Sequence, residues 1–202
     1  MIKNFLIIDC TGKNNSIALK INNKFFIKEL QTNLIKNEIL TLDIFNFIKE
    51  HKVKINSKFT IFANAGPGSF SGIRISLAIA KGIQLVKKVN IYSYNYFLLN
   101  AAPYLKDKEK IISIQKTNNF YYYSEGIFDK NYNFTFPEKV NFNKLKKEKS
   151  IIVIPGEIKD NDVIHNIDLK KIRIAKFNLG NIDLLIENNL LENKLIKPLY
   201  LS

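Results

Sequence analysis

One glycine-rich stretch constrains the fold more than any other, Gly66-Pro67-Gly68-Ser69-Phe70-Ser71-Gly72. Residues 58–63 before it have the length of a strand, and residues 73–86 after it have helical spacing of apolar side chains. Glycine permits positive φ angles and close backbone approach, whereas Pro67 fixes φ and cannot donate to a sheet. The segment therefore predicts a strand, a tight turn and a helix, with Ser69 or Ser71 capping the helix.

The start of a helix after such a turn also suits a bound anion, because its first amides have no partner within the helix. The stretch lacks the Gly-Lys-Ser/Thr that closes a P-loop, and Ser71 stands where the dinucleotide fingerprint has its third glycine. A phosphate-binding loop and a plain turn between strand and helix both remain open on this evidence.

The chain of 202 residues, 46% of them hydrophobic, can build one large domain or two smaller lobes. It has no run of about 18 uncharged apolar residues, so we expect no membrane span. Residues 1–8 are followed too soon by the acidic Asp9 for a signal peptide. The single cysteine, Cys10, excludes an internal disulfide, and we expect a cytoplasmic protein.

The formal net charge of +13 is compatible with nucleic-acid binding. Lysine, asparagine and isoleucine are abundant throughout, however, as the codon bias of an AT-rich genome would produce. The densest group of basic residues is Lys144, Lys146, Lys147 and Lys149, which surrounds the acidic Glu148. A specific basic RNA surface and a merely basic composition are both consistent with this distribution.

The order of predicted elements repeats once along the chain. A charged linker at 106–110 separates the two halves, and each half suggests a βββαβα plan, with the second reduced. The expected strands lie at 5–8, 16–21, 24–29, 58–63, 90–94, 111–114, 120–128, 133–136, 151–154 and 171–175, and the expected helices at 37–51, 73–86, 96–102 and 183–193. This pattern predicts a two-lobed α/β protein of the actin/Hsp70/sugar-kinase-like (ribonuclease H-like) fold, divided into residues 1–105 and 106–202.

The first predicted hairpin carries small polar residues next to an acid, namely Asp9, Thr11 and Gly12. In sugar kinases, actin and Hsp70 chaperones a hairpin so placed holds nucleotide phosphates. An actin-like ATP-dependent phosphotransferase, with Asp9 near a metal-bound nucleotide and Gly66–Gly72 near phosphate, is therefore one hypothesis. The alternative is that Asp9 only ends a strand.

The first two predicted helices have more apolar sides than a surface helix needs. Burial against their own sheet accounts for one side of each helix, and we expect a partner's helices to cover the other. The residues expected at this partner surface are Ile39, Leu42, Phe45, Ile73, Ser76, Leu77 and Ala80. The second lobe of the same chain could equally cover them.

Catalytic and metal-binding patterns are missing from the sequence. The two histidines, His51 and His165, are far apart, and neither a His-x-x-x-His pair nor a Gly-x-Ser-x-Gly elbow is present. We therefore expect no catalytic residues and no metal ligands in this chain. The residues favour a scaffold over a catalyst.

Three segments resemble the bacterial TsaB (YeaZ) family. The run Ile8-Asp9-Cys10-Thr11-Gly12-Lys13-Asn14-Asn15-Ser16-Ile17-Ala18-Leu19 is similar, without gaps, to its opening. Gly66–Ile75 resembles its most specific stretch, which includes Arg74, and Pro198-Leu199-Tyr200-Leu201 resembles its closing segment. The chain departs from the family's usual hairpin because Cys10 and Gly12 stand where threonines are common.

The resemblance implies an actin/Hsp70-like fold and a non-catalytic role. Such a protein supports TsaD in forming N6-threonylcarbamoyladenosine next to the tRNA anticodon, where the threonylcarbamoyl group is transferred from its AMP adduct. The ATPase TsaE joins the pair, ATP and metal belong to the partner subunits, and the chain alone is expected to form a homodimer. The resemblance extends to the peptidase M22-like group without its metal-binding histidines, and it makes Asp9, Thr11 and Gly12 a vestigial nucleotide loop.

Overall fold

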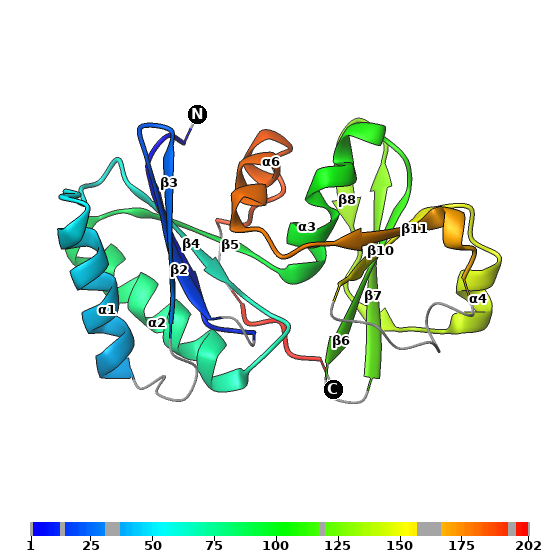
Figure 1. The fold of residues 1–202 in the computed structure, drawn as a ribbon, viewed down its shortest axis with the longest axis horizontal. Helices are drawn as coiled ribbons and strands as arrows, with labels where there is room; N and C mark the ends of the chain where they lie inside the picture. Colours follow the sequence, from blue (N-terminus) through cyan, green and yellow to red (C-terminus); the bar gives the residue numbers. More distant parts are fainter. Residues whose placement is uncertain are drawn as a thin grey trace. The chain divides into compact units, whose positions relative to one another are not determined.

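The computed structural model describes residues 2–12, 15–30, 37–117, 120–156, 167–193 and 197–201. It divides into two compact units, which are coloured along the sequence in Figure 1. Unit 1 comprises Met1–Asn95 together with Leu191–Tyr200, and unit 2 comprises Tyr96–Leu190.

Unit 1 is built on a five-stranded sheet in the order β3-β2-β1-β4-β5. The strands β1, β2 and β3 form an antiparallel meander, and β4 and β5 continue from β1 in parallel. Their bounds are Phe5–Asp9, Ser16–Ile21, Lys24–Glu29, Thr60–Asn64 and Asn90–Tyr94, and the helices α1 and α2 span Asn37–Glu50 and Phe70–Lys87. Parallel pairing needs crossover helices, which α1 and α2 provide.

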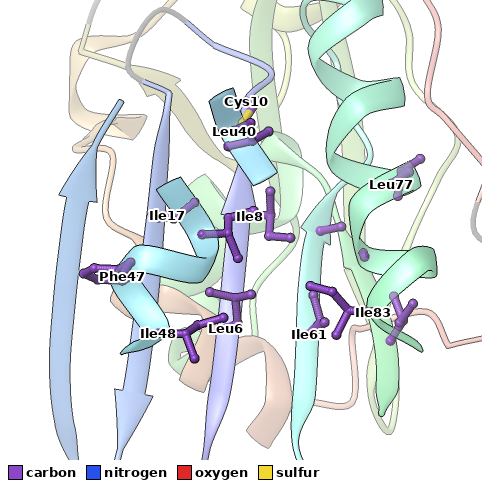
Figure 2. Packing of buried hydrophobic residues seen from close by; sticks show 14 of the residues in the cluster. Leu6, Ile8, Cys10, Ile17, Leu40, Phe47, Ile48, Ile61, Leu77 and Ile83 are labelled. Carbon is purple, nitrogen blue, oxygen red and sulfur yellow. The ribbon is translucent and has the colours of Figure 1, made fainter. Parts of the chain in front are cut away.

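The core of unit 1 lies between the sheet and these two helices. The apolar residues of α1 and α2 that recur every three or four positions cover the same face of the sheet. Figure 2 shows Leu40, Phe47 and Ile48 of α1 and Leu77 and Ile83 of α2 above that face. The opposite face carries a row of aromatic rings, Phe25, Phe5, Phe62 and Tyr92, with neighbouring centroids 6.4, 5.0 and 5.8 Å apart.

Unit 2 repeats this topology with the order β8-β7-β6-β10-β11, and the short β9 pairs with β7. Here β6, β7 and β8 are antiparallel, and β10 and β11 are parallel to β6. The bounds are Ile111–Thr117, Phe120–Phe128, Tyr132–Phe134, Glu138–Lys139, Ile151–Pro155 and Ile172–Ala175 for β6 to β11, and Tyr96–Ala101, Phe142–Lys146 and Ile182–Glu187 for α3, α4 and α6.

The duplicated α/β fold predicted from the sequence is confirmed by these two matching sheets. The second half is reduced, as expected, because α4 has five residues where α1 has 14. The predicted helix at 183–193 is shorter in the structure, since α6 ends at Glu187 and Asn189 adopts a positive φ of 54°.

The division between the units falls at Asn95–Tyr96, ten residues before the predicted boundary at 105–106. Helix α3 accounts for the difference, because its buried Phe97 and Leu99 belong to unit 2 rather than to the preceding strand. At the other end of the chain, Glu192 bridges to Ser93 of β5, and the backbone N–H of Leu199 donates to the Ala65 carbonyl at 2.7 Å. Residues 191–200 therefore belong to unit 1.

Candidate functional site

The glycine-rich loop connects β4 to α2 as the sequence predicts. Gly66 has a φ of +117°, which side-chain-bearing residues rarely adopt, and a Cβ there would lie 2.8 Å from the Leu199 carbonyl oxygen. The Gly66–Pro67 peptide bond is cis. Pro67 is buried, Gly68 is exposed, and Phe70 begins the helix.

The loop is fastened to the end of β1. The N–H of Ser69 donates to the Thr11 carbonyl at 2.8 Å. A Cβ on Gly72 would lie 1.8 Å from the Cys10 carbonyl oxygen, and one on Gly68 would lie 2.0 Å from that of Thr11. Glycine is therefore required at both positions for the two backbones to approach this closely.

Ser69 is the N-cap of α2, which confirms one of the two predicted caps. Its Oγ accepts from the N–H of Gly72 at 3.3 Å and lies 3.2 Å from Oγ of Ser71. The Ser69 hydroxyl therefore satisfies one of the first amides of α2, which have no partner within the helix.

Asp9 forms the polar centre beneath this loop. It is fully buried at the carboxyl end of β1. Its Oδ1 accepts from Oγ1 of Thr11 at 3.0 Å, and its Oδ2 accepts from Nδ2 of Asn64 at 3.0 Å and from the Tyr94 phenol at 2.7 Å. Thr11 is buried and Gly12 is half-buried in the same hairpin.

Asn64 and Tyr94 are site residues that the sequence analysis missed. They end the parallel strands β4 and β5, and they pair with one another in the sheet register. The signal was available, because polar residues at the ends of neighbouring parallel strands meet at one edge of the sheet. Asn64 also accepts the N–H of Gly66 at 2.8 Å, so the Asp9 cluster and the glycine-rich loop form a single unit of structure.

Cys10 lies beside this cluster but is chemically protected. The thiol is fully buried, and desolvation raises its pKa to about 12, which the nearby Ser76 hydroxyl only partly offsets. Because the thiolate is the reactive form of cysteine, this thiol is inert at neutral pH.

An aromatic stack marks the exposed side of the loop. Phe70 and Tyr200 have centroids 4.8 Å apart, and the Arg74 guanidinium lies 4.2 Å from the Phe70 centroid. Two of the three segments that carry the family resemblance, near the glycine-rich loop and at the chain's end, therefore meet in space.

The structure exposes the α1 residues predicted for the partner surface but buries the predicted α2 residues. On α1, Ile39, Leu42 and Phe45 are 38%, 61% and 55% exposed. They lie on the side of the helix away from the buried Leu40 and Ile44. These three residues are available to a partner.

On α2 the predicted residues are not accessible and need correction. Ile73, Ser76, Leu77 and Ala80 are all buried, because this side of the helix faces the sheet of unit 1. The exposed side of α2 carries a different set, with Leu85 and Val86 72% and 75% exposed, Ala78 and Gly82 exposed, and Ile75 and Ile79 half-buried.

Within the described ranges, no group of three His, Cys, Asp or Glu side chains is arranged to hold a metal ion. His51 packs between Phe26 and Phe47, with ring centroids 4.1 and 4.8 Å away, and His165 lies outside the described residues. None of the helices in the described part of the chain is long and apolar enough to cross a membrane.

Comparison with known proteins gives one curated sequence relative. The chain is 30% identical over 129 residues to the tRNA threonylcarbamoyladenosine biosynthesis protein TsaB of Buchnera aphidicola subsp. Baizongia pistaciae. The match includes 60% of this chain and spans 58% of the relative's length. No protein-family model matches the chain.

Two solved structures from Pseudomonas aeruginosa share the fold over nearly the whole chain. An uncharacterised protein with similarity to the peptidase YeaZ matches with a TM-score of 0.70, covering 99% of this chain and all of its own. YeaZ matches with a TM-score of 0.67, covering 98% of this chain and all of its own. Each is 12% identical in sequence. The chain is thus similar in sequence to a TsaB protein over part of its length and shares the fold of YeaZ over nearly all of it.

Proposed function

We propose that this chain acts in the biosynthesis of N6-threonylcarbamoyladenosine on tRNA, as a non-catalytic scaffold that binds and supports TsaD. The name of the Buchnera relative supports the pathway. TsaD performs the transfer of the threonylcarbamoyl group from its AMP adduct, and TsaE joins the pair. ATP and metal are held by these partner subunits, and the complex works in the cytoplasm.

The observation that carries the proposal is the exposed apolar surface of α1 and α2. We define the α1/α2 surface by its most exposed members, Leu42 and Phe45 on α1 and Leu85 and Val86 on α2. Scattered apolar residues are normal on a protein surface, but groups of them on helices that cover one face of a sheet mark interaction sites. Large exposed apolar side chains are also the residues that anchor interfaces when a partner covers them.

The outward side of α2 has the residue spacing that helix–helix packing requires. Ile75, Ile79, Gly82 and Val86 recur at intervals of four, three and four residues, the spacing with which one helix packs along another. A Cβ added to Gly82 would meet nothing within 4 Å, so the space above this glycine is open. A partner helix can approach the α2 backbone closely there. In the absence of TsaD the same surface would join two copies of this chain.

The test is capture of the cognate TsaD by tagged chain carrying Leu42→Asp or Val86→Asp. Both side chains are exposed, so the variants should fold, and circular dichroism and the melting temperature verify this. Leu169→Asp is the matched control, because Leu169 is 68% exposed but belongs to unit 2. We expect both α-helical variants to lose TsaD and the control to retain it. Capture by both at the wild-type level would refute the scaffold proposal. A substitution at Ala80 would not serve, because this side chain is buried and its replacement would test folding rather than capture.

A further inference from the structure

One end of unit 1 gathers most of that unit's positive charge. The parallel strands β1, β4 and β5 begin at this end, and the crossover helices α1 and α2 return the chain to it. We define the amino edge as the four segments that lie there, residues 2–5, 20–24, 49–60 and 87–90. They contain nine lysines and one acid, Glu50. The remaining described residues of unit 1 carry four basic and five acidic side chains, so its positive charge is concentrated at the amino edge rather than spread by composition.

Hydrogen bonds join the four segments of the amino edge to one another. Oδ1 of Asn4 accepts the N–H of Asn22 at 3.1 Å, and its carbonyl accepts the N–H of Thr60 at 3.4 Å. The carbonyl of Phe59 accepts the N–H of Asn90 at 3.2 Å. Figure 1 shows the N-terminus and the β2–β3 turn together at this end of unit 1. The lysines are therefore carried on one fixed platform rather than on independent loops.

The lysines of the amino edge are accessible to a large ligand. Eight of the nine are exposed, namely Lys3, Lys24, Lys49, Lys52, Lys54, Lys58, Lys87 and Lys88. Five neighbouring strands make an edge that is about 19 Å wide, since adjacent strands lie about 4.8 Å apart. That width corresponds to about five or six successive phosphates of one nucleic-acid strand. The amino edge therefore matches a polyanion with regularly spaced charges.

The exposed side chains between these lysines are polar and uncharged. They are Asn22, Asn23, Asn56, Ser57 and Asn90. Amides and hydroxyls of this kind bind the phosphate and sugar oxygens of nucleic acids. A membrane surface would instead need apolar side chains to insert, and stacking on unpaired bases would need an exposed aromatic ring. Among the described residues of the amino edge, neither kind of side chain is exposed.

We propose that the amino edge of unit 1 binds the backbone of double-stranded regions of RNA without reading the base sequence. The lysines contact phosphates, which supplies affinity but no sequence preference. The asparagines contact the 2′-hydroxyls that line the wide minor groove of an RNA helix, which favours RNA over DNA. The choice of a tRNA as the natural ligand rests on the proposed function, but binding of an RNA duplex by the amino edge does not.

The test measures fluorescence anisotropy of a labelled RNA duplex titrated with the full chain. The edge variant combines Lys3→Gln, Lys24→Gln, Lys54→Gln and Lys58→Gln, all of which replace exposed side chains. At roughly 0.1 M salt its affinity should fall at least about tenfold, because four phosphate contacts are lost. The slope of log K against log salt should become shallower by about 3–4, since each lysine–phosphate contact contributes about 1.

The matched control variant removes the same charge from unit 2. It replaces four exposed lysines with glutamine, Lys106, Lys130, Lys147 and Lys176. The two variants have equal net charge, and circular dichroism and the melting temperature verify that both fold. The control should bind the RNA duplex within about threefold of wild type, because charges more than about 10 Å from a contact are largely screened at this salt.

Three results would overturn the proposal. Equal losses of affinity in the two variants would mean that net charge alone attracts RNA. Tighter binding of wild type to a DNA duplex of the same length would exclude the preference for RNA. Binding to vesicles of phosphatidylcholine and phosphatidylserine that needs the same four lysines, without binding to the RNA duplex, would make the amino edge a membrane surface. TsaD capture by the edge variant should be normal, so failure of RNA binding leaves the scaffold proposal standing.

Discussion

The phenol of Tyr94 donates a 2.7 Å hydrogen bond to Oδ2 of Asp9, which lies 85 residues earlier in the chain. The bond runs from the end of β5 to the end of β1 and passes over β4, whose last residue, Asn64, donates to the same oxygen. Three parallel strands are thus tied at one edge of the sheet through a single buried carboxylate. This arrangement makes Asp9 a structural anchor for the glycine-rich loop above it.

Tyr94→Phe should lower the free energy of unfolding by about 1.5–3 kcal/mol, because hydrogen bonds to charged groups contribute this much and the partner stays buried. Urea denaturation followed by circular dichroism measures the loss. Tyr92→Phe, in the same strand and half-buried, is the control and should change stability by less than about 1 kcal/mol. Equal losses of unfolding free energy in the two variants would show that the Tyr94–Asp9 hydrogen bond makes no specific contribution to stability.

Two glycines of α2 should respond in opposite directions to alanine. Gly82 faces open space, so Gly82→Ala should stabilise the chain by about 0.5–1 kcal/mol through the better helix propensity of alanine. Gly72→Ala would place a methyl group 1.8 Å from the Cys10 carbonyl oxygen. The backbone would have to move, at a cost of about 1–3 kcal/mol.

Thermal and urea denaturation of the two glycine variants, made in the isolated chain, give this comparison directly. Both substitutions add the same methyl group to the same helix, so each serves as the control of the other. If Gly72→Ala were as stable as Gly82→Ala, the close packing of the loop on β1 would be incorrect.

Ionised Glu148 should stabilise the folded state of unit 2, and this stabilisation should be lost at acidic pH. Burial opposes ionisation of its carboxyl, but hydrogen bonds from Lys110 and Ser150 and the charges of Lys110 and Lys144 outweigh it and hold the pKa of Glu148 below its ordinary value of 4.5. A lowered pKa in the folded state favours folding above pH 4.5, and this contribution is lost as the pH falls through the folded-state value. It should be at most about 1 kcal/mol, since the pair is partly exposed.

Denaturation midpoints of wild type and Glu148→Gln between pH 7 and pH 3 measure this effect. The variant should be the less stable protein at pH 7, and the difference should shrink towards pH 3. Glu187→Gln, which removes an exposed carboxylate of α6, should not change the pH profile. A constant difference between wild type and Glu148→Gln across this range would contradict the assignment.

The strand order could be predicted because local patterns are strong in this chain. The buried run at 5–8 and the turn at Asn22-Asn23 specify β1 and the β2–β3 hairpin without help from distant residues. Helix sides were harder to assign. Both sides of α2 are apolar, so periodicity alone could not tell that Ala80 faces the sheet while Val86 faces outward.

The hydrogen-bonded cluster around Asp9 could not be predicted, because it depends on contacts between residues that are distant in the sequence. Asp9 was identified as a candidate, but its donors Asn64 and Tyr94 come from strands that pair only in the folded sheet. Similarly, the close approach of Leu199 to Gly66 occurs only because residues 191–200 pack in unit 1. Long-range contacts of this kind are fixed by topology rather than by local propensity.

An actin-like phosphotransferase is the rival function for this chain. A nucleotide phosphate would have to approach the hairpin at Thr11 and the start of α2, yet the N–H of Ser69 already donates to the Thr11 carbonyl and Gly72 packs directly on that of Cys10. The oxygens of Asp9 likewise accept from Thr11, Asn64 and Tyr94 rather than facing an open site. We therefore expect titration calorimetry of the isolated chain with Mg-ATP to show no binding at micromolar concentrations. Micromolar binding that Asp9→Asn abolishes in a folded protein would favour the phosphotransferase and would mean that the loop opens to admit phosphate.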